Sequence, residues 1–420
     1  MGALRVIGHP GTLVAVFTIF IISGYLVRPT PTWAFPFYAI IVPLTLWMAW
    51  RERTQDWLRD KGLWLALAAT TWFAASTLWS VETSAGLVGD ALAGWAASSL
   101  FIVAGVAVFT HSSDAWRQRL LLGVPVAAMM NACISITRYL VEGADARLTG
   151  WAETRHPILG ANVMIFAGLL ALPLLNRDNT RRSIFLGIAT VTLVSIFVYL
   201  TGSRGPLLTW SIALLVYACA IGSRLGVAAI LSVGVAGACA ALLLLQMPPV
   251  AELGLPGPLH DILSTAQQNL QRSSFRMEIW SIALERVSEQ PILGLGIANG
   301  IAFSEQWSFP HSLYISALYY GGTIGLLLVV ALLGSMAWRA FRARDSRQRA
   351  LLLALVTLPA VAGLTDMSSI VRSPEENWLF FWMPLIMVLG LTRRPATPVN
   401  GAVDSPSCDS KASASNGKEF

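Results

Sequence analysis

The stretch SIFLGIATVTLVSIFVYLTGSRGPLLTWSIALLVYACAI, residues 183–221, decides the class of protein. It holds two apolar runs, 183–202 and 205–221, which meet at a short turn around Arg204. Runs of this length can cross the roughly 30 Å apolar core of a bilayer as helices. Because a backbone in lipid must satisfy its own polar groups, and because these runs do not alternate apolar and polar residues, we expect helices and not barrel strands.

The rest of the chain has the same character. Of its 420 residues 55% are hydrophobic and only 12% are charged, about half the charged fraction of a soluble protein. The sequence therefore predicts an all-α polytopic membrane protein with about twelve transmembrane helices. The predicted spans are 11–27, 33–50, 62–80, 85–110, 119–140, 159–175, 183–202, 205–221, 225–246, 311–338, 350–366 and 377–392.

Basic residues in the short loops indicate how the chain is threaded. Loops 51–61, 176–182 and 339–349 contain four, three and five arginines or lysines, and the positive-inside rule places such loops in the cytoplasm. With twelve crossings, both termini are cytoplasmic as well. The net charge of +6 mostly reflects this bias. Since the basic residues are spread over many loops, it does not indicate a nucleic-acid-binding surface.

We expect a single membrane domain over residues 1–394, whose first span is an anchor and not a cleaved signal peptide. It includes a long outer loop, 247–310, with helices around 259–272 and 274–289. Residues 395–420 are rich in Ser, Ala, Pro and Gly, which predicts a disordered cytoplasmic tail. The four cysteines form no disulfide framework or CxxC pattern.

The outer face is unusual because it is expected to carry many arginines. They are Arg147, Arg155, Arg204, Arg272, Arg276, Arg286 and Arg372. Arg204, flanked by glycines, either reaches toward lipid phosphates or clamps an anionic ligand through its planar guanidinium group. Arg276 heads an outer helix, where it either pairs with Glu278 or Glu285 or joins such a clamp.

A histidine stands at the start of a predicted span in SFPHSLYISALYYGG, residues 308–322. Pro310 is expected to begin this helix. The first turn of a helix leaves its N–H groups unpaired, so the N–H that proline lacks is not needed there. His311 would then lie in the first turn, where the helix dipole favours neutral imidazole. His156, in TRHP, is either a turn residue or a donor to an anionic group. Asp366, in GLTDM, either caps a helix or orients a base or hydroxyl.

No cofactor or metal ion is expected. The acidic residues are scattered, without a DxD or HxxE cluster. The segment GLGIANG, residues 294–300, lacks the strand and helix of a dinucleotide-binding unit, so we interpret it as a turn toward the bilayer.

These residues resemble the bacterial O-antigen ligase family, which is related to O-antigen polymerases and to general protein O-oligosaccharyltransferases. Four features carry the resemblance: TGSRG between two spans, FRMEIWSIAL followed by PILGLGIANG, PHSLYISALYYGGTIGLLL, and the long outer loop between late spans. Ser312 stands where the family often has asparagine, so an amide has no role there.

The resemblance implies a metal-independent membrane glycosyltransferase of the GT-C type, in the bacterial inner membrane with a periplasmic active site. It would move a glycan from undecaprenyl diphosphate to a hydroxyl group, which for a ligase belongs to a sugar of lipid A–core. Arg204, Arg276 and His311 match the positions of the family's active-site residues.

Physical chemistry agrees with these roles. Fixed guanidinium groups stabilise charge that builds on a departing diphosphate, and a neutral His311 can take the proton of the attacking hydroxyl. A single displacement inverts the anomeric carbon. Arg147, Arg155, His156 and Asp366 are further candidates for binding substrate.

Three other functions stay open. A polymerase would use a polyprenyl-linked acceptor, and a protein O-glycosyltransferase would have a larger outer C-terminal region. A transporter or flippase could also have twelve spans, but its polar residues tend to lie mid-membrane. Here they gather at the outer ends of the spans, which favours an enzyme.

Overall fold

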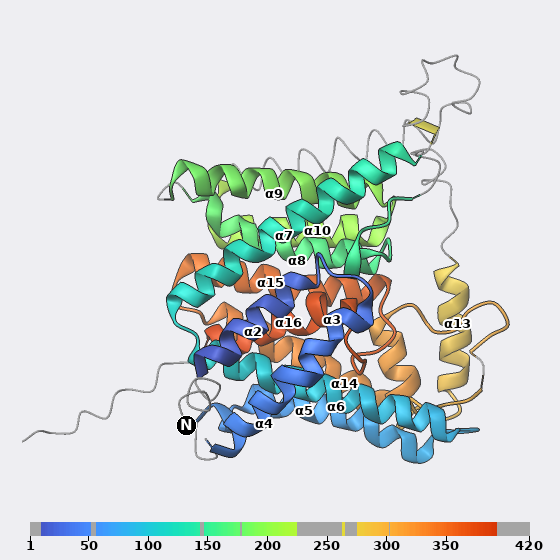
Figure 1. Ribbon diagram of the computed structural model, residues 1–420. Helices are drawn as coiled ribbons and strands as arrows, with labels where there is room; N and C mark the ends of the chain where they lie inside the picture. The colour runs from blue at the N-terminus through green and yellow to red at the C-terminus, as the bar shows by residue number, and fades with distance from the viewer. Residues whose placement is uncertain are drawn as a thin grey trace, which may run out of the picture.

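The computed structural model describes residues 10–51, 56–142, 147–176, 179–224, 263–264, 275–301 and 303–392 (Figure 1). Within these ranges all regular secondary structure is helical, which confirms the predicted all-α class. The elements are α2 (Pro10–Ser23), α3 (Thr30–Pro36), η1 (Phe37–Ile41), α4 (Val42–Arg51), η2 (Asp56–Arg59), α5 (Lys61–Ala75), η3 (Ser76–Trp79), α6 (Ala85–His111), α7 (Asp114–Val141), η4 (Ala152–Thr154), α8 (Leu159–Ala171), η5 (Leu172–Leu175), α9 (Arg181–Leu200), α10 (Arg204–Ala220), α13 (Arg276–Val287), α14 (Leu313–Phe341), α15 (Ser346–Thr365), η7 (Trp378–Trp382) and α16 (Met383–Leu391).

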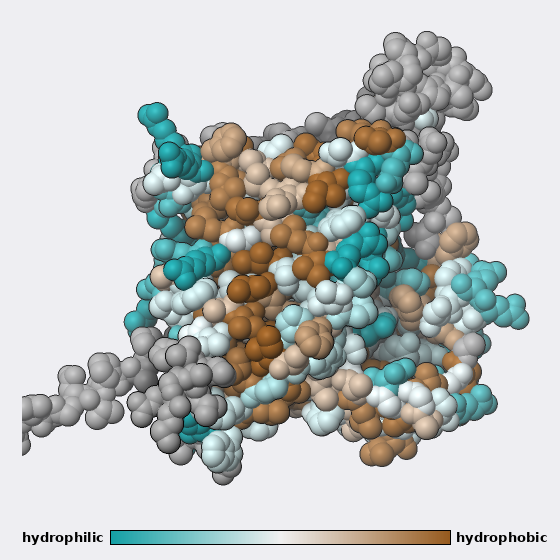
Figure 2. All heavy atoms as spheres, in the orientation of Figure 1, coloured by the Kyte–Doolittle hydropathy of each residue, from teal (hydrophilic) through white to brown (hydrophobic). Residues whose placement is uncertain are grey.

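The protein is a multi-pass membrane protein. In the described part of the chain, six helical stretches are long and apolar enough to cross a bilayer: Thr30–Arg51, Ala85–His111, Asp114–Val141, Arg181–Leu200, Leu313–Phe341 and Ser346–Thr365. Shorter apolar helices cover Gly11–Ser23, Leu159–Leu175, Arg204–Ala220 and Trp378–Leu391. Figure 2 shows a broad apolar band over one face of the bundle, with hydrophilic side chains toward its two ends.

Eleven of the twelve predicted spans overlap helices of the structure. The ninth, 225–246, lies outside the described residues, as do the tail 395–420 and all but 263–264 of the outer helix predicted at 259–272. The total of twelve and the domain division therefore stay predictions. The second outer helix is confirmed as α13, which in Figure 1 stands at one edge of the bundle and crosses the direction of the other helices.

The bundle is held together at its centre by aromatic rings. Phe101 of α6 stacks on Trp378 of η7 with ring centroids 4.4 Å apart, and Phe37 of η1 meets the same indole edge-on at 4.7 Å. All three side chains are fully buried. Glycines let helices approach closely elsewhere, as small residues do between membrane helices: a Cβ on Gly105 would meet Ile386, and one on Gly168 would meet Trp210.

Helix α14 is interrupted at Gly322, whose φ of 63° and ψ of −165° are not helical. The freed carbonyls of Tyr319 and Tyr320 accept hydrogen bonds from the N–H groups of Leu295 (2.8 Å) and Gly296 (3.0 Å). Membrane helices tolerate such breaks where neighbouring chain satisfies the freed backbone groups. The segment 291–296 therefore docks on α14, which agrees with the turn predicted for the glycine run.

Candidate active site

His311 and Asp366 form the centre of the site. Nδ1 of His311 lies 3.0 Å from Oδ1 of Asp366. The carboxylate side chain is 6% exposed, whereas the imidazole is 31% exposed. Because an ionised carboxylate only accepts hydrogen bonds, Nδ1 carries the proton, which leaves Nε2 of a neutral ring as an acceptor.

The position of His311 differs from the prediction that Pro310 begins the helix. Helix α14 begins at Leu313. His311 has a left-handed backbone with φ of 52°, and Ser312 is extended with φ of −153° and ψ of 130°. The Ser312 hydroxyl donates to the Gly363 carbonyl of α15 at 3.3 Å, and this tertiary contact accompanies the late helix start. His311 thus precedes the helix and faces the end of α15.

Asp366 combines both of the roles left open by the sequence. Its N–H donates to the Ala362 carbonyl at 3.1 Å as α15 ends, and its own backbone is extended. The side chain is then directed to His311, on a different helix. The end of α15 therefore fixes the orientation of the imidazole.

Arg204 lies beside this end of α15. It is the first residue of α10, and its side chain is exposed. A Cβ on the next residue, Gly205, would lie 2.5 Å from Oγ1 of Thr365, the neighbour of Asp366. The absence of a side chain at Gly205 therefore allows the turn to pack directly against the residues that precede Asp366.

Arg147 holds the same turn from the other side. Its Nε donates to the Thr201 carbonyl at 2.8 Å, and its guanidinium group also donates to the Ser203 hydroxyl. Ser203 in turn donates to the Pro157 carbonyl at 3.1 Å. Arg147 is thus placed to fix the backbone that carries Arg204.

His156 caps helix α8. Its Nδ1 accepts hydrogen bonds from the N–H groups of Ile158 (3.3 Å) and Leu159 (3.1 Å), so this ring nitrogen carries no proton. The side chain is exposed. His156 is therefore a turn residue in the structure, and its other ring nitrogen faces outward from the cap as a possible donor.

Arg155 is part of a second cluster, which involves Thr30 at the start of α3. Its Nη2 donates to the Thr30 hydroxyl at 2.8 Å, and this hydroxyl donates to Oε1 of Glu153 at 2.7 Å. Glu153 is 1% exposed. Burial raises the pKa of Glu153 to about 7; the Thr30 hydrogen bond and Arg155 oppose the rise, and Glu376 and Glu375 add to it.

Arg276 lies at the start of α13. Helix α13 packs Ile279 and other buried residues against Tyr319 of α14. The ring of Phe275, which precedes Arg276, lies 6.1 Å from that of Trp307, four residues before His311. Among the described residues Arg276 makes no hydrogen bond with His311 or Asp366, so the structure does not bring it into contact with this pair.

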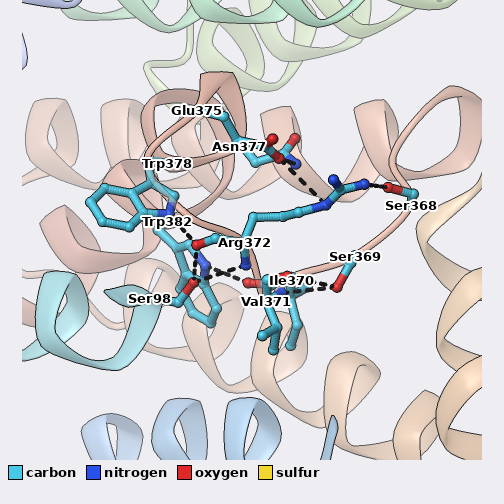
Figure 3. A network of polar contacts seen from close by, with 10 residues as sticks. All are labelled: Ser98, Ser368, Ser369, Ile370, Val371, Arg372, Glu375, Asn377, Trp378 and Trp382. Carbon is cyan, nitrogen blue, oxygen red and sulfur yellow. Dashed lines mark hydrogen bonds and ion pairs between the residues drawn. The ribbon is translucent and has the colours of Figure 1, made fainter. Parts of the chain in front are cut away.

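A further group of polar residues lies in the polar loop 367–377, between α15 and η7 (Figure 3). Arg372 donates to the Ser368 hydroxyl, and its Nε lies 3.6 Å from the carboxylate of Glu375. Asn377 donates to the same carboxylate at 2.6 Å. Our sequence analysis named Arg372 only among the outer arginines. Two adjacent carboxylates in a short loop between apolar spans, Glu375 and Glu376, were the signal that could have found this group.

Comparisons with known proteins agree with the resemblance to O-antigen ligases found in the sequence. The family model for O-antigen ligase matches residues 189–330, a range that contains Arg204, Arg276 and His311. A curated O-antigen ligase from Pseudomonas aeruginosa is 28% identical over 275 residues, which cover 63% of this chain and 62% of that protein. Over these residues the chain is similar to the O-antigen ligase family. The match spans less than two thirds of the length of this relative.

The structure groups the predicted residues unequally. It joins His311 to Asp366 and packs the Arg204 turn, with Arg147 behind it, against the same end of α15. Arg155 is held elsewhere, at Thr30. Over the described part of the chain, no three His, Cys, Asp or Glu side chains gather in a way that could hold a metal ion.

Proposed function

We propose that the protein is an O-antigen ligase, which transfers a glycan from undecaprenyl diphosphate to a sugar hydroxyl of lipid A–core. The observation that carries the proposal is the contact between His311 and the buried Asp366, next to the turn that presents Arg204. The similarity to O-antigen ligases supports the reaction class.

In the proposed reaction His311 is the general base. Its Nε2 takes the proton of the acceptor hydroxyl, and the hydroxyl oxygen attacks the anomeric carbon of the donor sugar. The bond from that carbon to the diphosphate breaks, with inversion, and the electron pair leaves with the diphosphate. Asp366 stabilises the imidazolium ion that forms, as a carboxylate does in other His–Asp pairs.

Arg204 and Arg276 are the proposed diphosphate ligands. Both are arginines, which suit phosphate oxygens because their donors are planar and their charge does not titrate. Arg204 is exposed at the head of α10, where the helix N-terminus also favours an anion. Arg147 would act by holding the turn, while Arg155 and His156 stay weaker candidates for direct contact with substrate.

The membrane arrangement belongs to the same proposal. We infer twelve spans of the GT-C type in the bacterial inner membrane, with both termini in the cytoplasm and the site at the periplasmic face. The basic loops 51–61, 176–182 and 339–349 support this orientation. Both lipid substrates would then reach the site from the bilayer, without a cofactor.

Reconstitution tests the proposal. The purified protein in liposomes is given a polyprenyl-diphosphate-linked glycan together with lipid A–core, in the presence of EDTA. We expect glycosylated lipid A–core, and no product with His311→Ala. A product linked to a polyprenyl carrier would instead identify a polymerase, the second candidate, which would use the same donor and the same residues.

A further inference from the structure

The polar loop 367–377 reaches deep into the membrane domain. Ser98 lies thirteen residues from each end of the 27-residue helix α6, about 20 Å at 1.5 Å per residue. Its hydroxyl donates to the Arg372 carbonyl at 2.8 Å and accepts from the Arg372 N–H at 3.1 Å. The backbone of Arg372 is therefore fixed at the middle of a membrane-spanning helix.

Two tryptophans hold the loop at this depth. The indole of Trp378 donates to the Arg372 carbonyl at 3.0 Å, and that of Trp382 donates to the Ile370 carbonyl at 2.9 Å (Figure 3). Both indoles are buried. Irregular backbone at membrane depth is tolerated only where it is buried in protein or lines a water-filled cavity.

Two charged side chains of this loop are partly exposed. The Arg372 side chain is 42% exposed and that of Glu375 is 28% exposed, although η7 and most of α16 directly after the loop are buried. Charged groups inside a membrane domain are costly and usually mark a functional path. The loop thus presents partly exposed charged side chains level with the middle of α6.

The loop also contains a buried acceptor atom without a donor. Asn377 is 4% exposed, and its amide nitrogen donates to Glu375. The carboxylate can only accept, so the amide oxygen must point away from it. Among the described residues no donor meets this oxygen. A buried acceptor without a donor costs stability unless something else supplies the hydrogen.

The charges select the kind of ligand. Arg372 is already paired with Glu375, and Glu376 and Glu375 act on Glu153 across the cluster. A phosphate group would meet several carboxylates and be repelled. Hydroxyl groups suit this set, because they donate to carboxylate and amide oxygens and accept from a guanidinium group.

We propose that Arg372, Glu375, Glu376 and Asn377 form a subsite for the hydroxyl groups of a substrate sugar. The polar loop begins directly after Asp366, whose carboxylate contacts His311. The subsite is therefore carried by the same segment of chain that orients the proposed general base. It rests on the proposed function in one respect, namely that the sugar belongs to the glycan donor or to the lipid A–core acceptor.

Direct binding tests the subsite without requiring turnover. The full chain in nanodiscs is titrated calorimetrically with two lipid-free probes, the oligosaccharide of the core and the oligosaccharide of the glycan repeat. We expect one of them to bind, and Glu376→Gln and Arg372→Ala to weaken that binding about tenfold, as the loss of a charged hydrogen bond would. Binding of the core probe assigns the subsite to the acceptor, and binding of the repeat probe assigns it to the donor.

The matched control is Asp114→Asn, which changes another arginine–carboxylate pair, with Arg117, beyond the far end of α6 (3.3 Å). It should leave binding unchanged. In the transfer assay Glu376→Gln should raise KM about tenfold for one substrate only, with kcat nearly constant; a purely structural defect would lower kcat for both.

Separate outcomes overturn the two proposals. If neither probe binds the parent protein, or both variants bind as it does, the subsite is wrong even where transfer occurs. If the protein transfers no glycan but binds a probe in a Glu376-dependent way, the proposed function fails and the subsite stands.

Discussion

His311 and Asp366 are 55 positions apart in the chain, and their side chains meet at 3.0 Å where two helices of different spans come together. The carboxylate is buried and the imidazole is partly open. The same helix end packs against Gly205, next to Arg204. The proposed base and the proposed diphosphate ligand therefore share one rigid frame, the end of α15.

Asp366→Asn should lower the transfer rate about 10²–10³-fold without unfolding the protein. An amide no longer favours Nδ1–H of His311 and does not stabilise the imidazolium ion. The imidazolium ion of His311 would then form without its carboxylate partner, so the pH–rate profile should change as well. Asp345→Asn at the other end of α15 is the control, since Asp345 only caps that helix.

Full activity of Asp366→Asn, with an unchanged pH–rate profile, would exclude the pair from catalysis. The assay is initial-rate transfer in liposomes at several pH values.

Arg204→Ala should reduce kcat about 10²–10³-fold, as the loss of one donor to a developing charge does in other enzymes. Arg204→Lys should restore only part of the rate, because an ammonium group lacks planar bidentate donors. Arg182→Ala, at the opposite end of α9, serves as the control. Equal rates for Arg204→Ala and the parent protein would contradict a role in diphosphate binding and favour the alternative that Arg204 binds lipid headgroups.

Gly205→Ala should impair both folding and transfer. The added Cβ would lie 2.5 Å from Oγ1 and 2.7 Å from Cβ of Thr365, so the turn must shift away from α15. We expect a loss of about 1–3 kcal/mol in the free energy of unfolding and at least a tenfold slower transfer. Gly334→Ala on α14 meets no atom within 4 Å and should behave like the parent protein.

Thermal unfolding in detergent and initial rates would be measured on both alanine variants. If Gly205→Ala matched Gly334→Ala in both measurements, close packing between α10 and α15 would not matter for the site.

Stability should fall as the pH rises through the range set by Glu153. Burial raises the pKa of this carboxyl group to about 7 in the folded protein, whereas an unfolded glutamate loses its proton near pH 4.3. The folded state therefore binds more protons between these values. The contribution of the Glu153 carboxyl group to stability is complete below about pH 4 and is lost as the pH rises toward 7. Thr30, Arg155, Glu375 and Glu376 are the groups that face it.

Glu153→Gln keeps a neutral side chain at every pH. It should match the parent protein near pH 4 and unfold at a higher temperature at pH 8. Glu142→Gln, which changes an exposed pair with Arg138, should show no such trend. A parallel pH dependence of Tm in Glu153→Gln and the parent protein would mean that Glu153 is already ionised in the folded state.

The helices were largely predictable because span length and apolar composition are local properties. The turn at Arg204 and the outer helix α13 were found from glycines and helical spacing. The start of α14 was predicted wrongly at Pro310, because proline chemistry is local whereas the backbone of Ser312 is tied to Gly363, on another helix.

The candidate site was predictable in its residue types but not in its connections. Nothing near His311 in the chain indicates that Asp366 is its partner. The depth of the polar loop could not be foreseen either, since the bonds between Ser98 and Arg372 join positions 274 apart. Arginines and histidines attract attention in an apolar sequence, whereas adjacent glutamates in a short loop resemble ordinary surface residues.

The interruption of α14 at Gly322 has a consequence for engineered hybrids of this family. The carbonyls of Tyr319 and Tyr320 are completed by N–H groups from residues 295 and 296, and Thr323 N–H donates to the Pro291 carbonyl at 2.8 Å. In a chimera that exchanges the outer loop alone, residues 291–296 and 319–324 would come from different parents, although their backbone groups hydrogen-bond to one another. Chimeras with altered glycan preference should therefore carry 291–296 and 319–324 from the same parent.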